Sequence, residues 1–163
     1  MKGVPSIWLP LLLLVSWLSA ACLQEAEVAH LPELDRAGVS AVLAAADAAR
    51  VEAFAAADPA PLRPLFADPA LGPLSHQLAG LRVHGERVEE SDTSRRLVHW
   101  VAAEGSAEGV LEVAGEQRLR GKDEPAGGWS RIVRQWFAAV RWSGGRWLVV
   151  EARDLPPPQW WKA

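Results

Sequence analysis

Few side chains in this sequence have the types and spacings that carry catalysis or metal binding. The histidines are His30, His76, His84 and His99, and none of them are spaced as H-x-x-H or H-x-H. A zinc site needs three or four ligands, which cannot be gathered within one helix or strand here. The sequence also lacks a G-x-S-x-G element, a phosphate-binding loop and a glycine-rich dinucleotide motif. It therefore predicts no metal and no cofactor.

Two residues are candidates for a general base. His99 lies in the apolar stretch LVHWVA, where burial would suit an imidazole to acid–base work. Asp154 lies near the end of the last apolar stretch of the chain. The preferred interpretation of His99 is a hydrogen-bonded sheet residue, and that of the carboxylates is cross-strand ion pairing on a solvated face. The sequence leaves catalysis undecided and favours a protein that is not an enzyme.

The stretch SRIVRQWFAAVRW indicates a binding surface. Both faces of a strand formed by it are largely apolar, so either both faces are covered or one of them lines a concave pocket. In such a pocket Arg134, facing an inward carboxylate, would orient a polar ligand. The candidate ligand-binding residues are Trp100, Arg134, Trp136 and Phe137.

Tryptophan is unusually frequent, with nine residues against three phenylalanines. Cross-strand packing around one hairpin accounts for Trp136, Trp142 and Trp147. The C-terminal segment 156–163, PPPQWWKA, cannot extend a central strand because of its three prolines. Its two large aromatic residues suit a contact surface. We expect them to fold back as a lid over an apolar pocket, with binding to a partner or contact with the membrane as the alternatives.

The only cysteine, Cys22, follows a leader formed by residues 1–21. The cationic start at Lys2, a short apolar run and small residues at its end are typical of a secretory signal peptide, and the run is too short for a membrane span. The leader resembles a bacterial lipoprotein signal, although leucine stands four residues before Cys22 instead of three. We predict export and acylation of Cys22, which anchors the protein to the cell membrane. Ordinary cleavage near Ala21, giving a secreted or periplasmic protein, is the alternative.

The charges of the chain do not point to nucleic acid. There are 17 basic and 20 acidic residues, and removal of the leader with Lys2 leaves 16 against 20, a formal charge of −4. The two signs are scattered, whereas nucleic-acid binders concentrate Lys and Arg on one face. The length that remains is normal for one domain with one core.

The first half of this domain is predicted to be helical. Residues 39–57, VSAVLAAADAARVEAFAAA, are rich in strong helix formers, repeat their apolar side chains at helical spacing and offer Ser40 as an N-cap. Pro59 ends this helix. The proline-rich stretch that follows predicts two short helices, at 61–66 and 72–81.

From residue 82 onward the apolar period falls from helical spacing to alternation. Residues 82–90 and 95–104 are separated by the polar sequence SDTS and are predicted to form two strands. Three more strands are expected from VLEVAGEQRL, SRIVRQWFAAVRW and RWLVVEARDL, the last two joined by a tight hairpin at Ser143-Gly144-Gly145. The sequence thus predicts an α+β fold, with N-terminal helices packed on a curved antiparallel sheet of about five strands.

This order of elements, with a last hairpin that reads GRWLVVEAR, resembles the nuclear transport factor 2-like domains. It is most similar to a subgroup with an alanine-rich first helix and a proline-broken second segment, which includes the ARC6-type IMS domain of chloroplast division proteins and bacterial lipoproteins. The resemblance covers residues 38–155. It divides the chain into the signal peptide (1–21), a tether (22–37), the domain itself and the C-terminal tail (156–163).

The resemblance implies a pocket between the helices and the concave face of the sheet. Proteins of this fold include ketosteroid isomerase and polyketide cyclases as well as binding domains without catalysis, so the fold does not decide the function. The enzymes commonly use tyrosine donors, and this chain has no tyrosine. We therefore expect a non-catalytic, membrane-anchored extracytoplasmic domain that binds an envelope protein partner or a small apolar ligand. An isomerase- or cyclase-like enzyme using His99 or Asp154, and a structural envelope protein, are the alternatives.

Overall fold

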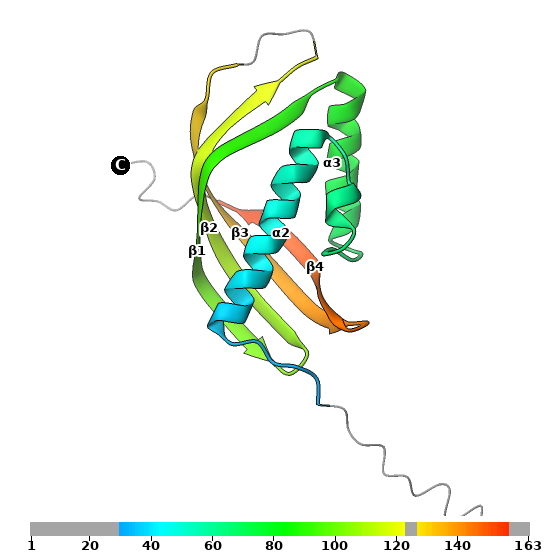
Figure 1. The fold of residues 1–163 in the computed structure, drawn as a ribbon, viewed down its shortest axis with the longest axis vertical. Helices are drawn as coiled ribbons and strands as arrows, with labels where there is room; N and C mark the ends of the chain where they lie inside the picture. Colours follow the sequence, from blue (N-terminus) through cyan, green and yellow to red (C-terminus); the bar gives the residue numbers. More distant parts are fainter. Residues whose placement is uncertain (1–29, 123–126, 157–163) are drawn as a thin grey trace, which may run out of the picture. The chain divides into compact units, whose positions relative to one another are not determined.

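The computed structural model describes residues 30–122 and 127–156. The signal peptide, Cys22 and the tail beyond Pro156 lie outside the described residues. The elements follow one another along the chain as α2 (Arg36–Ala56), the 3-10 helix η1 (Ala60–Leu62), α3 (Leu71–His84), β1 (Arg87–Ala103), β2 (Ser106–Arg120), β3 (Ser130–Ser143) and β4 (Arg146–Leu155). The strands form one antiparallel meander in the order β1-β2-β3-β4, and α2 lies along the inside of the bent sheet (Figure 1).

The predicted α+β class is confirmed, but within residues 30–122 and 127–156 the sheet has four strands and not about five. The SDTS sequence is not a turn between two strands, because residues 87–103 form one continuous strand, β1. The register with β2 shifts between Ser91 and Ser94, and Asp92 has φ 50°. Extra residues in one strand are absorbed as a β-bulge, which bends the strand without ending it. A polar, turn-like composition fits a bulge as well as a hairpin.

Helix α2 begins at Arg36, three residues before the start predicted at residue 39. Its N-cap is Asp35, whose carboxylate accepts a hydrogen bond of 2.7 Å from the backbone N–H of Gly38, so Ser40 lies inside the helix. The chain before it is also fixed: the backbone N–H of Leu31 donates to Glu104 at 2.7 Å. These contacts place the end of the predicted tether against the β1–β2 turn.

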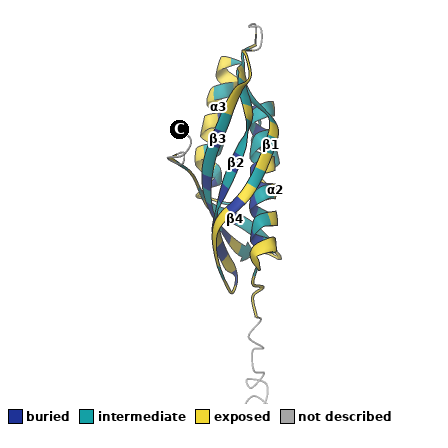
Figure 2. Ribbon diagram, turned by 90° about the vertical axis from the view of Figure 1, so that its left-hand side faces the viewer, coloured by how far each residue is buried: buried dark blue, intermediate teal, exposed yellow. Residues whose placement is uncertain are grey.

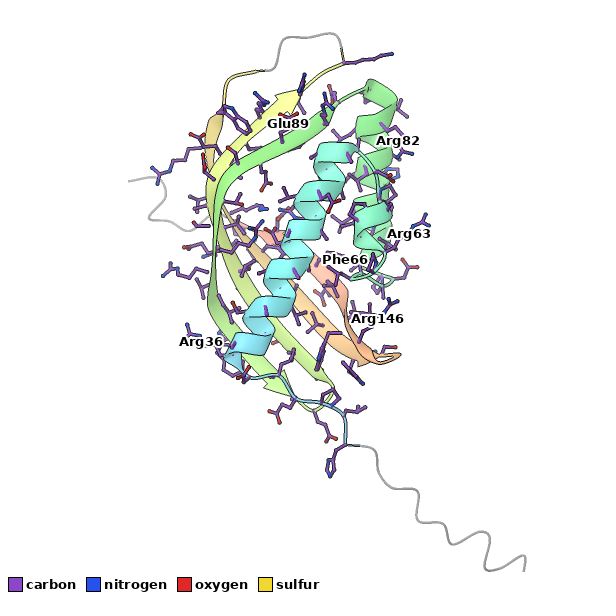
Figure 3. All side chains as sticks on the ribbon, in the orientation of Figure 1. Arg36, Arg63, Phe66, Arg82, Glu89 and Arg146 are labelled. Carbon is purple, nitrogen blue, oxygen red and sulfur yellow. The ribbon has the colours of Figure 1, made fainter. Side chains whose placement is uncertain are left out.

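The proline-rich stretch forms η1 and α3 in place of the two helices predicted at 61–66 and 72–81. Helix α3 continues to His84 and ends at Gly85, which has φ 67°, so residues 82–84 are helical and not the start of a strand. Between the two helices Phe66 pairs with Val149 of β4 as a parallel bridge. Figure 3 shows Phe66 on the connection that lies between α3 and β4.

Both helices cover the same face of the sheet, and in the view of Figure 2 the strands lie in front of them. The buried core lies between the helices and this face. It includes Leu43 of α2, Leu78 of α3, Leu111 of β2 and Trp136 of β3, each no more than 2% exposed. Both faces of β3 are largely apolar, yet in the described part of the chain the helices cover only one face of the sheet. Within the described residues, no helix is long and apolar enough to cross a membrane.

Gly109 on β2 lies where Leu43 of α2 packs closely on the sheet. A Cβ at this position would lie 3.0 Å from the Cδ1 of Leu43 and 3.0 Å from the carbonyl oxygen of His99. We expect Gly109→Ala to lower the free energy of unfolding by about 1–3 kcal/mol, because the added methyl group overpacks this contact. Urea unfolding followed by circular dichroism measures the change. Gly80→Ala is the control, since its Cβ would meet nothing within 4 Å. Equal losses in the two variants would contradict the close packing.

Candidate binding site

One charged side chain is completely buried in the described part of the chain, and it is an acid. Asp47 lies in the middle of α2, on the side that faces the sheet, and it is 0% exposed. Arg95 Nε donates to Asp47 Oδ2 at 2.7 Å, and Arg134 Nη2 donates to Asp47 Oδ1 at 2.8 Å. A buried carboxylate needs such partners, because burial without them costs several kcal/mol.

The register of the sheet explains why these two arginines meet one carboxylate. Arg95 of β1 and Arg134 of β3 are both paired with Val113 of the strand between them. Residues directly opposite one another in neighbouring strands point to the same face, so both guanidinium groups project toward α2. The pairing of the strands therefore brings the two arginines close together on one face of the sheet. Helix α2 crosses that face and brings Asp47 to them.

Arg50 and Glu90 extend this cluster. Arg50 follows Asp47 by one helical turn, and its Nε lies 3.5 Å from Asp47 Oδ1. Arg134 Nη2 also donates to Glu90 Oε2 at 3.1 Å. At the edge of the cluster, Arg50 Nη1 and Asp154 Oδ1 are 4.0 Å apart, and the Asp154 side chain is 64% exposed. Asp154 is therefore screened by water, whereas the other five groups are largely buried.

Burial governs the titration of this cluster. Desolvation raises the pKa of Glu90, and the positive charges of Arg134 and Arg50 oppose this shift. Desolvation also lowers the pKa of Arg134, and the neighbouring Arg50 lowers it further. Both pKa shifts show that the protein interior disfavours the charged forms of Glu90 and Arg134. The repulsion between the two guanidinium groups is compensated only in part by Asp47 and Glu90.

A cavity of about 180 Å³ adjoins the cluster. Its wall combines apolar and charged side chains from α2 and all four strands: Arg50, Val51, Phe54, Val88, Glu90, Gln117, Arg134 and Asp154. The exposed carboxylate of Asp154 marks the side on which the cavity reaches solvent. The site thus has an apolar wall next to two guanidinium groups, which is the composition of a small-molecule pocket.

Several nitrogen atoms of Arg50 and Arg134 make no hydrogen bond within the described residues. Arg134 directs Nη2 at Asp47 and Glu90, but its Nε and Nη1 are buried without a hydrogen-bond partner among the described residues. Nε and Nη2 of Arg50 also lack a hydrogen-bond partner there, although Nε lies 3.5 Å from Asp47 Oδ1 as an ion pair. These four nitrogen atoms are buried, so an acceptor in the cavity contacts them only if the side chains move.

The structure brings two of the residues singled out from the sequence into this site, Arg134 and Asp154. The other candidates lie elsewhere. Trp136 is 2% exposed and packs in the core, with its ring centroid 6.5 Å from that of Phe66, so no ligand reaches it without displacing core residues. Phe137 lies on the opposite face of the sheet from Arg134, under the guanidinium group of Arg153 at 4.8 Å.

Trp100 and His99 are likewise separate from the cavity. Trp100 is 37% exposed and lines a hollow with Leu34 and Asp35 at the start of α2. His99 is exposed on β1, opposite Val110 of β2, so the apolar stretch around it does not bury it. Among the described residues no group of three or more His, Cys, Asp or Glu side chains is placed to hold a metal ion.

Asp47, Arg50, Glu90 and Arg95 were not singled out from the sequence. One signal was present: Asp47 follows Leu43 by four residues within an apolar helical stripe, and Arg50 follows it by three. An aspartate on the buried side of a helix requires a buried partner. The partners themselves come from strands 48 and 87 residues away along the chain.

Comparison with known proteins defines the fold and does not assign a family. No protein-family model matches the chain, and no curated protein sequence is significantly similar to it. Among solved structures, the domain is similar to the intermembrane space region of the chloroplast protein ARC6, with a TM-score of 0.68. The match covers 76% of this chain and 98% of that one at 13% sequence identity. The predicted resemblance to ARC6-type IMS domains is therefore confirmed at the level of the fold.

Proposed function

We propose that this protein is an extracytoplasmic, lipid-anchored domain of the nuclear transport factor 2-like class that binds a small ligand and does not catalyse a reaction. The observation that carries the proposal is the cavity between α2 and the sheet, which combines apolar side chains with the guanidinium groups of Arg50 and Arg134. The similarity of the fold to a region of ARC6 that lies in an intermembrane space supports a location outside the cytoplasm.

The geometry favours binding over catalysis. A general base must be held within reach of a substrate in a site that excludes water. Asp154 is 64% exposed at the edge of the cavity, and His99 is exposed on the sheet. Of the two general bases predicted for the isomerase- or cyclase-like alternative, only Asp154 lies at the cavity, and it is largely solvated. An envelope protein partner is favoured by one other feature, the exposed apolar residues Val98 and Val101 on β1.

The ligand is tested by co-purification. The protein is isolated from its native membranes without denaturation, and bound small molecules and proteins are identified by mass spectrometry. We expect the wild type to carry a small molecule that Arg50→Gln lacks. Arg96→Gln is the control, because Arg96 pairs with Glu112 at 2.7 Å and is 69% exposed. Identical small-molecule content in all three proteins would contradict a binding role for the cavity and leave a structural envelope protein as the explanation.

The anchor is tested by metabolic labelling with a fatty-acid probe. We expect the wild type to be labelled and recovered with membranes, and Cys22→Ser to be unlabelled and released, because Cys22 is the only thiol in the chain. One acyl chain binds membranes only marginally, so stable recovery also requires the second lipid that lipoprotein maturation adds. Equal labelling of both proteins would disprove acylation at Cys22.

A further inference from the structure

We infer that the cavity beside Arg50 and Arg134 binds a small molecule with a carboxylate group and an apolar body. This inference rests on the proposed function and adds the chemical class of the ligand. The carboxylate is attracted by the positively charged guanidinium groups of Arg50 and Arg134, which line the cavity. The apolar body contacts the side chains of Val51, Phe54 and Val88.

The charges favour an anion over a neutral or cationic ligand. Three guanidinium groups, those of Arg50, Arg95 and Arg134, face two buried carboxylates, those of Asp47 and Glu90. One positive charge in this interior is therefore not compensated by a buried acid. The nearest further acid, Asp154, is mostly in solvent, where its attraction is weak.

Contacts within the protein hold the two arginines of the cavity wall in place. Arg95 donates to one oxygen of Asp47, and Arg134 Nη2 donates to the other. Both guanidinium edges of Arg134 that bind a carboxylate with two parallel hydrogen bonds include this Nη2, so Arg134 acts on the ligand through its charge. On Arg50, Nε and Nη2 share one edge, and this Nε lies 3.5 Å from Asp47 Oδ1.

The size of the cavity limits the ligand. An apolar cavity of about 150 Å³ holds benzene, so a cavity of about 180 Å³ accommodates a single ring with its carboxylate at the open side. Phe54 supplies an aromatic face, and the guanidinium carbon of Arg50 lies 5.9 Å from the centroid of that ring. Aromatic and short branched carboxylic acids fit these dimensions, whereas a long acyl chain does not.

The experiment compares three molecules of the same shape and different charge by isothermal titration calorimetry with the purified protein: benzoate, benzamide and benzamidine. We expect benzoate to bind with a Kd of about 1 mM or below, benzamide at least about tenfold more weakly, and benzamidine not measurably. Because the series uses the wild type, the result does not depend on the folding of any variant.

Two variants locate the binding. Arg50→Gln should weaken benzoate binding about tenfold or more, and the control Arg96→Gln should not change it. Glu90→Gln keeps a hydrogen-bond acceptor for Arg134 but removes a negative charge, so it should strengthen benzoate binding by roughly threefold to tenfold. Circular dichroism of each variant checks that it is folded.

The outcomes separate this inference from the proposed function. Equal binding of benzoate and benzamide would overturn the carboxylate preference and leave a pocket for apolar ligands. Preferential binding of the cation benzamidine would also overturn the carboxylate preference. Such a result would show that the negative charges of Glu90 and Asp154 outweigh the arginines in the cavity. No binding of any of the three would overturn the assignment of a ring-sized carboxylate, while co-purification tests the proposed function independently.

Discussion

Replacing Asp47 with alanine is expected to lower the free energy of unfolding by about 3–5 kcal/mol. The loss arises because Arg95 and Arg134, whose side chains are 22% and 15% exposed, lose their shared partner, and only Arg134 retains an acid, Glu90. Domains of this size are stable by about 5–15 kcal/mol, so this single change removes a large part of the total. Urea unfolding at neutral pH, followed by tryptophan fluorescence and circular dichroism, measures the difference.

Two further variants define the origin of this effect. Asp47→Asn keeps the shape and one acceptor but not the charge, so it should lose less stability than Asp47→Ala. Glu151→Ala removes an acid whose pair with Arg153 at 3.8 Å is more than half exposed, and we expect a change below about 1 kcal/mol. If Asp47→Ala were as stable as Glu151→Ala, the buried cluster would not contribute to the fold as described.

Replacing Trp136 with alanine is expected to lower the free energy of unfolding by about 3–5 kcal/mol. The indole is 2% exposed between α2, the connection at Phe66 and the sheet, so its loss leaves a large hole in the core. A residue that acted only on a ligand would instead lower affinity and leave stability unchanged. Denaturant unfolding of Trp136→Ala, compared with the milder Trp136→Phe, distinguishes the two roles.

Trp100 provides the matched comparison for Trp136. It is 37% exposed at the start of α2, and we expect Trp100→Ala to cost about 1 kcal/mol or less. Equal losses at the two positions would contradict the assignment of Trp136 to the core and of Trp100 to the surface.

The elements that depend on local sequence were predictable. The alanine-rich helix α2, the break at Pro59 and the hairpin at Gly144-Gly145 all follow from propensity and turn chemistry between neighbouring residues. The bulge in β1 was not, because SDTS has the composition of a turn. Whether such a segment reverses the chain is decided by its pairing with residues 114–116 of β2, which only the complete sheet specifies.

The candidate site was predictable only in part, for the same reason. Alternation along β3 places Arg134 on the face shared with Trp136, and the sequence suggested an inward carboxylate facing it. That carboxylate is mainly Asp47, which comes from a helix 87 residues earlier in the chain. Its position depends on how α2 crosses the sheet, and this crossing is set by close contacts such as that of Leu43 with Gly109. The spacing of residues along the sequence does not predict how α2 crosses the sheet.

The central claim is that Arg50 and Arg134 form a binding site in the cavity between α2 and the sheet. Nuclear magnetic resonance of the ¹⁵N-labelled protein observes the Nε–H groups of arginine directly, and each signal is assigned from its Arg→Gln variant. On titration with benzoate, we predict saturable shifts of the Arg50 and Arg134 signals, with the signals of the surface residues Arg96 and Arg153 unchanged. Shifts of the surface signals alone, or no saturable shift of the Arg50 and Arg134 signals, would contradict the claim.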